Sequence, residues 1–201
     1  MLSATPVARA TTELTLVYPF PDFLIYTKLC KVLAEKINTA AAGSIKIKVL
    51  PFNSIGMFKQ PPAVASGRVD LTCTPAAFYA RGLPENEAVS TSNSTPETVR
   101  ANGGFKILDD LLQQHMKMKY LGWTGSGGLF RIYTKDAPKF AASGLPDFTG
   151  TKLRDNPIYG AFFRAMNATT HSIKSSEVYS ALEKGVVNSS AWATIGLKGL
   201  K

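Results

Sequence analysis

The sequence has few residues of the kinds that most metal sites and catalytic centres use. It contains only 2 cysteines and 2 histidines in 201 residues. His115 and His171 lie far apart, with no cluster of cysteines or carboxylates beside either one, so we predict no metal site. The segment Gly125-Ser126-Gly127 is not a nucleophile elbow, because residue 124 is a threonine where that motif needs a glycine. No other catalytic constellation is present, and we expect no cofactor.

Long apolar runs and acidic residues are also scarce. No segment is apolar enough to cross a bilayer, so we expect a chain that does not span a membrane. Only 14 acidic residues stand against 23 lysines and arginines, which gives a formal charge of +9. The basic residues are scattered, and the pairs Lys46/Lys48 and Lys117/Lys119 each fit one solvated face of a strand. The charge therefore indicates a mild preference for anionic solutes rather than a nucleic-acid partner.

The cysteines and the first residues bear on the cellular compartment. Cys30 and Cys73 each lie on an apolar face, which favours two buried thiols over a disulfide. Ala8-Arg9-Ala10 has the small-x-small form of a signal-peptidase site, but the apolar stretch expected before it is missing. We therefore interpret residues 1–10 as the remainder of a signal peptide or a tag-like segment.

The first part of the chain alternates strand and helix patterns. Apolar residues at alternate or helical spacing predict a strand over 14–18, a helix over 23–37, a strand over 44–50, a helix over 60–66 and a strand over 69–73. Such β-α-β-α-β alternation favours a mostly parallel sheet flanked by helices. A capping box at 94–97 predicts another helix, which Gly103-Gly104 interrupts, and 120–123 fits a strand.

A second run of the same kind follows the glycine-rich segment 124–128, which fits a flexible crossing between two lobes better than a phosphate cradle. We predict strands over 129–134, 151–154 and 170–173, with helices over 158–166 and from Ser175-Ser176 to Gly185. The predicted lobes are residues 11–124 and 125–201.

The segment from Asp147 to Pro157 predicts an anion site. Arg154 falls at the carboxyl end of a strand, and Asn156-Pro157 has the form of a helix start. Ligands collect at that edge of open α/β sheets, where a helix start also attracts anions. The guanidinium of Arg154 could grip a carboxylate with two parallel hydrogen bonds. The plainer alternative is a solvated or salt-bridged surface arginine.

Three separated motifs resemble the periplasmic solute-binding proteins of tripartite ATP-independent periplasmic (TRAP) transporters: VASGRVDLT (64–72), GTKLRDNP (150–157) and SSEVYSALEKGVVNSSAW (175–192). The resemblance implies an α/β, two-lobed, periplasmic-binding-protein-like architecture, with mostly parallel sheets flanked by helices. It also implies that the second lobe and the segments returning to the first lobe are incomplete, because family members continue beyond the tryptophan that matches Trp192.

The resemblance also implies a ligand site and a function. It assigns the main carboxylate-binding arginine to Arg154 and a second one to Arg131. The other residues that we predict to bind ligand are Trp192, Phe20, Thr74, Phe78, Asn156 and Ser175. Some relatives hold the ligand partly through a metal, but Ala191 stands where an acidic metal ligand would be expected, so we predict none here.

We therefore predict a periplasmic, non-enzymatic protein that captures a small organic acid between its lobes and delivers it to TRAP-type membrane permease subunits. Phe20, Phe78 and Trp192 favour an acid with an apolar or aromatic body. Two alternatives remain open: an α/β enzyme that acts on a carboxylate substrate, and an extracytoplasmic sensor domain with the same lobes. Nucleic-acid binding ranks last.

Overall fold

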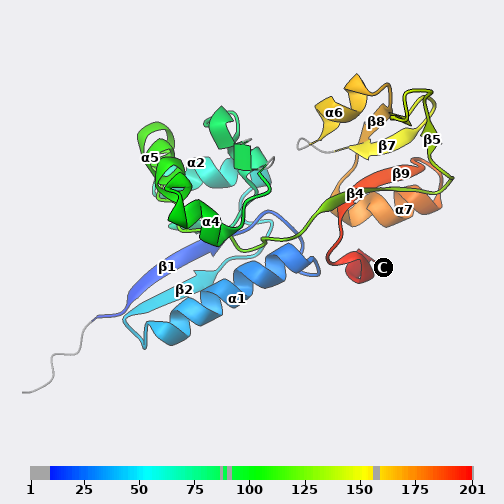
Figure 1. Cartoon of the computed structure of the whole chain (residues 1–201). Helices are drawn as coiled ribbons and strands as arrows, with labels where there is room; N and C mark the ends of the chain where they lie inside the picture. The colour runs from blue at the N-terminus through cyan, green and yellow to red at the C-terminus, as the bar shows by residue number, and fades with distance from the viewer. Residues whose placement is uncertain (1–9, 87, 90–91, 156–158, 201) are drawn as a thin grey trace, which may run out of the picture.

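The computed structural model describes residues 10–200 except 87, 90–91 and 156–158. Two α/β lobes lie side by side, each built on its own sheet (Figure 1). The segment 117–129 runs from one lobe to the other, and Gly196 near the end comes back beside Ile25 of the first lobe (Figure 1). The two-lobed α/β prediction is confirmed.

The first lobe contains a three-stranded parallel sheet of order β2-β1-β3. Its elements are β1 (Thr12–Val17), α1 (Ile25–Ala40), β2 (Ile45–Val49), η1 (Met57–Lys59), α2 (Gln60–Ala65) and β3 (Leu71–Thr72). Alternate residues of β1 face opposite sides of the sheet. Leu16 packs with Cys30 and Ala34 of α1, whereas Val17 packs with Ala63 of α2. The sheet is therefore covered on both faces, as the β-α-β-α-β pattern predicts.

Short helices complete the first lobe. These are η2 (Ala76–Tyr79), η3 (Pro84–Asn86), α4 (Pro96–Ala101) and α5 (Gly104–Met116). They lie on the side of the sheet opposite α1 (Figure 1). The break between α4 and α5 falls at Gly103-Gly104, as predicted. Residues 120–123, for which we predicted a strand, form none, because none of the described strands pairs with them.

The second lobe contains a mixed sheet of order β4-β9-β7-β8, in which only β4 is antiparallel to its neighbour. The elements are β4 (Phe130–Thr134), β5 (Lys139–Phe140), β6 (Pro146–Asp147), β7 (Lys152–Asp155), α6 (Gly160–Ala165), β8 (Thr169–Ser172), η4 (Ser175–Glu177), α7 (Val178–Glu183), β9 (Ser189–Ala193) and η5 (Leu197–Leu200). Helices α6 and α7 cover opposite faces of this sheet (Figure 1).

The cysteine prediction is wrong, because Cys30 and Cys73 form a disulfide, with their Cα atoms 6.0 Å apart. Cys30 lies on the face of α1 that packs on the sheet, and Cys73 directly follows β3. Both apolar faces were identified correctly. They are faces of the same core, however, and the distance between their Cα atoms lies within the range that a disulfide spans.

Two predicted helix caps differ in detail. The N-cap of α4 is Thr95, whose hydroxyl accepts from the Thr98 backbone N–H, rather than Ser94. Ser175 opens a 3₁₀ turn that precedes α7, and no side chain caps that turn. In both places the helix begins close to the predicted residue, and only the hydrogen-bonding partner was wrong.

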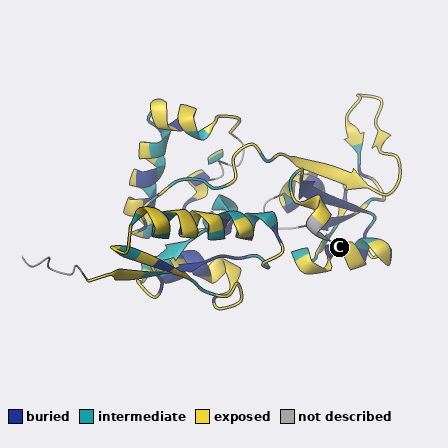
Figure 2. Cartoon of the chain, turned by 90° about the horizontal axis from the view of Figure 1, so that it is seen from below, coloured by how far each residue is buried: buried dark blue, intermediate teal, exposed yellow. Residues whose placement is uncertain are grey.

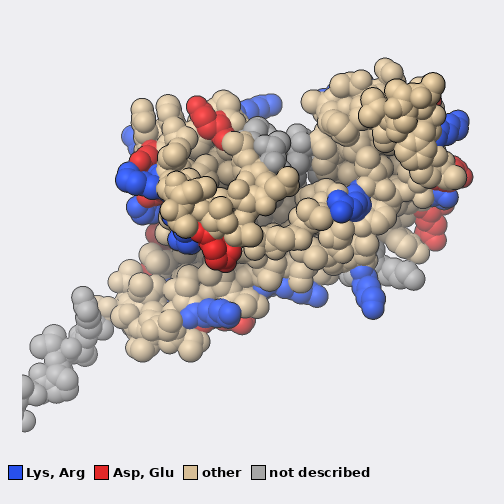
Figure 3. All heavy atoms as spheres, viewed as in Figure 1, with Lys and Arg blue, Asp and Glu red and all other residues tan. Residues whose placement is uncertain are grey.

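The surface agrees with the scattered charge of the sequence. Lysine and arginine are spread over both lobes of the face seen in Figure 3, with acidic residues between them. Buried residues line the sheets, whereas β4 is exposed along its length (Figure 2). Within the described residues, no helix combines the length and the apolar character needed to cross a membrane.

Candidate functional site

Arg154 is a buried charged residue near the carboxyl end of β7. Its exposed fraction is 6%, and Leu153 before it is fully buried. Strand β7 lies inside the sheet between β9 and β8, and the Cα partner of Arg154 on β9 is Ser190. Alternate residues of a strand point to the same face of the sheet. Arg154 therefore lies on the same face as Ser190 and as Trp192, two residues further along β9.

The guanidinium of Arg154 is oriented by neutral groups. Its Nε donates to the carbonyl oxygen of Ile173 at 2.9 Å, and its Nη1 donates to the hydroxyl of Tyr159 at 2.9 Å. Its central carbon lies 5.3 Å from the centre of the Trp192 ring, within the range of a cation–π contact. These contacts fix the direction of the guanidinium, and each of them is made by an uncharged group.

No carboxylate pairs with Arg154 among the described residues. The adjacent Asp155 belongs to the opposite sheet face and pairs with Arg164 at 3.1 Å. A buried cation without a counter-ion costs several kcal/mol, so such a group is retained where an anion arrives from outside. The surface or salt-bridged alternative for Arg154 does not fit this environment.

An aromatic wall from the first lobe adjoins the Arg154 site. Phe20 packs in the cluster that contains Trp192 and Val178, so it joins the two lobes. Its ring centre lies 5.6 Å from that of Phe78, and Phe78 lies 5.1 Å from Phe58. The structure thus brings four predicted residues into one connected group: Arg154, Trp192, Phe20 and Phe78.

The remaining predicted residues, Thr74, Ser175 and Asn156, differ in how they relate to this group. Thr74 follows β3 near Phe78, and its hydroxyl is buried without a hydrogen-bond partner in the described part of the chain. Ser175 is half-buried in η4, close in sequence to the Ile173 carbonyl that holds Arg154. Asn156 lies outside the described residues.

Arg131 differs from its predicted role as a second carboxylate-binding arginine, because its side chain is exposed. It pairs in register with Trp192 across β4 and β9, so both belong to one sheet face. Its side chain is nevertheless exposed, and its Nη1 donates to the carbonyl oxygen of Phe130 at 3.2 Å.

Two tyrosines belong to the site and were not predicted. The Tyr159 hydroxyl accepts from Arg154 and donates to the Ala191 carbonyl at 2.8 Å, and burial raises the pKa of Tyr159. Tyr26 lies 5.7 Å from Phe20, and burial, followed by the nearby Tyr159 phenol, raises its pKa. No sequence pattern marks either residue, because the two come from different lobes and meet only in the fold.

The site offers nothing that resembles a metal centre. Within the described residues no group of three or more His, Cys, Asp or Glu side chains is close enough to hold an ion. Its polar groups are a guanidinium, phenols and hydroxyls. They are suited to bind an anion with an apolar body.

The comparisons with known proteins bear on the fold and on the family. First, the two-lobed fold is that of solved TRAP periplasmic solute-binding proteins. A protein from Desulfovibrio salexigens, in complex with diglycerolphosphate, matches with a TM-score of 0.69 and 19% identity over 94% of this chain and 63% of that one. A protein from Sulfurospirillum deleyianum with bound succinate gives 0.63 and 18%, over 90% and 60%. The Bordetella pertussis receptor DctP7, which binds pyroglutamic acid, gives 0.64 and 21%, over 90% and 60%.

Second, residues 20–199 match the family described as bacterial extracellular solute-binding protein, family 7 (DctP). The chain belongs to this family. It spans less than two thirds of the length of the solved structures above, between 60% and 63%.

Proposed function

We propose that this protein captures a small organic acid between its lobes, residues 11–124 and 125–201, and delivers it to a TRAP-type membrane permease. The single observation that carries the proposal is the buried Arg154, for which the described residues offer no carboxylate partner. The similar proteins were solved with succinate, pyroglutamic acid and a phosphate ester, all anions, which supports an anionic ligand here. We place the protein in the periplasm and propose that it returns its ligand unchanged.

Charged, aromatic and hydroxyl side chains would bind different parts of the acid. Arg154 forms the charge-assisted pair with the carboxylate, and Tyr159 keeps the guanidinium oriented. Trp192, Phe20 and Phe78 form an apolar wall, and the unpartnered Thr74 hydroxyl can bind one polar atom of the ligand. An acid with an apolar or aromatic body fits this wall better than a sugar acid, whose hydroxyls would find few partners.

Calorimetry with an arginine series tests the proposal. A thermal-shift screen of succinate, pyroglutamate, glucuronate and benzoate first finds the acids that stabilise the chain. Arg154→Ala should then weaken the binding of the best acid by about 2 kcal/mol or more, roughly 30-fold in affinity, because it removes one partner of a desolvated charge pair. Arg154→Lys should also weaken it, since lysine lacks the two-pronged geometry.

Arg68→Ala is the matched control, because Arg68 is an exposed arginine of the first lobe. It changes the net charge equally and should leave the affinity unchanged. Equal affinities of the wild type and Arg154→Ala would overturn the assignment of Arg154 as the carboxylate-binding residue. NMR spectra of the acid after incubation should show no product, and turnover would instead favour an enzyme.

A further inference from the structure

Tyr26 brings a phenol of the first lobe to the junction with the second. It lies in the first turn of α1, and the start of this helix is beside the second lobe (Figure 1). Its ring is half-buried, lies 5.7 Å from that of Phe20, and packs against the apolar cluster that contains Trp192. Tyr26 therefore approaches the candidate site from one lobe, whereas Arg154 belongs to the other.

The two phenols of the site differ in their hydrogen bonds. Tyr159 gives its hydrogen to the Ala191 carbonyl and accepts from Arg154, so it has no hydrogen left for a ligand. Tyr26 forms no hydrogen bond with another of the described residues. Burial raises the pKa of Tyr26, so its hydroxyl keeps the hydrogen at physiological pH. Of these two phenols, only Tyr26 can donate to a bound molecule.

The Tyr26 phenol also lies near the charged end of the site. It is close enough to the Tyr159 phenol for the two to interact electrostatically, and the Tyr159 hydroxyl contacts the guanidinium of Arg154. A carboxylate has about four lone-pair sites for hydrogen bonds, and a guanidinium fork occupies two of them. A carboxylate on Arg154 can therefore accept from a second donor.

We propose that Tyr26 is a further ligand-binding residue, whose hydroxyl donates to the same carboxylate that Arg154 binds. This inference rests on the proposed function. The anion is then held by a cation of the second lobe and by a neutral donor of the first, so it links the two lobes. A hydrogen bond to an ionised acceptor is roughly twice as strong as one between neutral groups, so Tyr26 adds to the preference for an acid.

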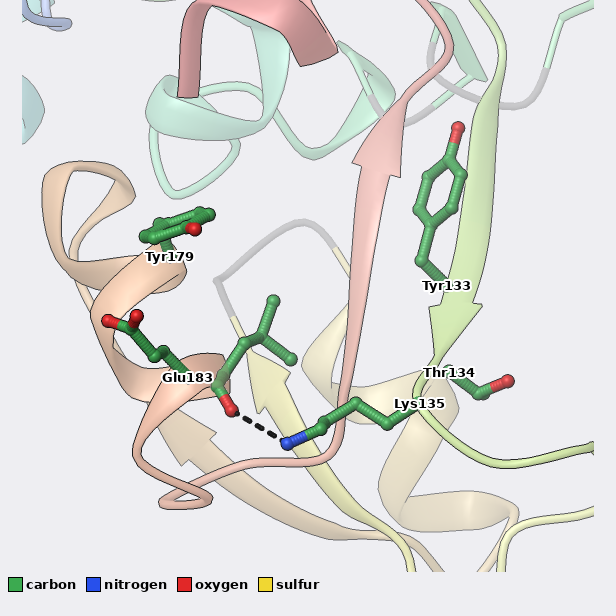
Figure 4. Close-up of a pocket in the computed structure, with 6 residues that line it drawn as sticks. Tyr133, Thr134, Lys135, Tyr179 and Glu183 are labelled. Atoms are coloured by element: carbon green, nitrogen blue, oxygen red, sulfur yellow. Dashed lines mark hydrogen bonds between the residues drawn. The ribbon is translucent and has the colours of Figure 1, made fainter. Parts of the chain in front are cut away.

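A competing place for an acid is the hollow between β4 and α7. Tyr179 and Glu183 lie on one side of this cavity of about 320 Å³, and Lys135 lies on the other (Figure 4). Lys135 is a cation, but its Nζ already donates to the Leu182 carbonyl at 3.3 Å. The Glu183 carboxylate lines the same hollow and repels an anion. We therefore expect the acid at Arg154 rather than in this hollow.

Tyr26→Phe tests the inference, because it removes the hydroxyl and keeps the ring. Calorimetry with the acid that stabilises the wild type most, out of succinate, pyroglutamate, glucuronate and benzoate, should show a roughly tenfold lower affinity. The melting temperature of the ligand-free chain should not fall, since the hydroxyl has no partner to lose among the described residues. A merely structural role of Tyr26 predicts the reverse, a lower melting temperature with unchanged affinity.

Tyr179→Phe is the matched control, because it removes the same atom at the competing hollow. It should bind the acid like the wild type. A double-mutant cycle with Arg154→Lys then tests whether Tyr26 and Arg154 hold one carboxylate. Two groups that act on the same anion are coupled, so the loss of affinity from Tyr26→Phe should be smaller in the Arg154→Lys background than in the wild type.

The outcomes separate this inference from the proposed function. A wild type that binds none of the acids would overturn both. A wild type that binds an acid as tightly as Tyr26→Phe does would overturn the inference alone. Losses from Tyr26→Phe and Arg154→Lys that add to within about twofold would also overturn it, because they would place Tyr26 on a different part of the ligand.

Discussion

Tyr159 connects the guanidinium of Arg154 to the sheet. Its hydroxyl accepts from Arg154 and donates to the Ala191 carbonyl on β9, so one phenol links β7 and β9. Its ring also contacts Phe163 of α6, with ring centres 5.4 Å apart. Such packing restricts the phenol to few orientations. The orientation of Arg154 therefore depends on a residue that itself need not touch the ligand.

Tyr159→Phe should weaken acid binding by about tenfold, because the guanidinium loses one of the hydrogen bonds that orient it, an effect of about 1.4 kcal/mol. Calorimetry with the best acid of the thermal-shift screen measures the change. Tyr179→Phe, at an exposed tyrosine on α7, is the control and should bind like the wild type. Equal affinity of Tyr159→Phe and wild type would mean that the other contacts of Arg154 suffice to orient it.

The position of Arg154 could be predicted from the sequence, whereas the tyrosine that orients its guanidinium could not. A strand pattern followed by an N-cap residue and proline places an arginine near the carboxyl end of a strand. Tyr26 and Tyr159, in contrast, come from separate lobes, and the order of residues along the chain contains no signal for their meeting. The prediction of two free thiols was wrong for the same reason. The sequence identifies each apolar face, but it does not show whether two such faces belong to one core.

Most elements of both sheets were predicted, because β1 and β2 alternate apolar and polar residues and α1 has a helical stripe. The exception is β9, a central strand of the second sheet. All five of its residues, Ser189 to Ala193, are buried. A strand covered on both faces does not alternate, and its small residues resemble a loop.

The disulfide ties α1 to the end of β3, with a sequence separation of 43 residues. Closing a loop of that length lowers the entropy of the unfolded chain, which corresponds to about 4 kcal/mol of stability. The double variant Cys30→Ser/Cys73→Ser should therefore melt roughly 10 °C lower by calorimetry. A reductant should lower the wild-type melting temperature but leave that of the double variant unchanged. A reductant-sensitive double variant would contradict the assignment.

The short helix η2 carries a tyrosine that links folding to alkaline pH. Burial, followed by the nearby Tyr120 phenol, raises the pKa of Tyr79 from 10.0 to about 12. The neutral phenol is thus favoured in the folded state. The stabilisation of the folded state by this neutral phenol is complete below pH 10 and is lost as the pH rises from 10 to 12. The loss amounts to about 2–3 kcal/mol.

Urea unfolding between pH 9 and 12 measures this effect. The free energy of unfolding should fall less steeply in Tyr79→Phe than in the wild type, because phenylalanine cannot ionise. Tyr133→Phe, at an exposed tyrosine, should follow the wild-type curve. Parallel curves for Tyr79→Phe and the wild type would show that other groups cause the alkaline loss.

At the scale of the whole molecule, an apolar cluster joins the two lobes. Leu24 and Phe20 of the first lobe pack with Val178, Trp192 and Ala193 of the second. The alternation of strands and helices predicts each sheet by itself. The division into two lobes was indicated by the glycine-rich segment 124–128 and by the resemblance of three motifs to a family, since periodicity contains no information on how separate sheets meet.

If the lobes close on an acid, the radius of gyration should fall when the acid binds. Small-angle scattering of the wild type at saturating concentration of the best acid should show this decrease. Arg154→Ala should show none at the same concentration. A wild-type radius that does not change would argue for a rigid site.

The bond between Cys30 and Cys73 has a consequence for a chain that a protease has cut. It encloses the exposed turn at 51–54, an accessible place for cleavage. A molecule severed there would still migrate as one species on a non-reducing gel, because the cross-link holds both pieces. Only a thiol would release them, so damage to this loop would stay hidden until the sample is reduced.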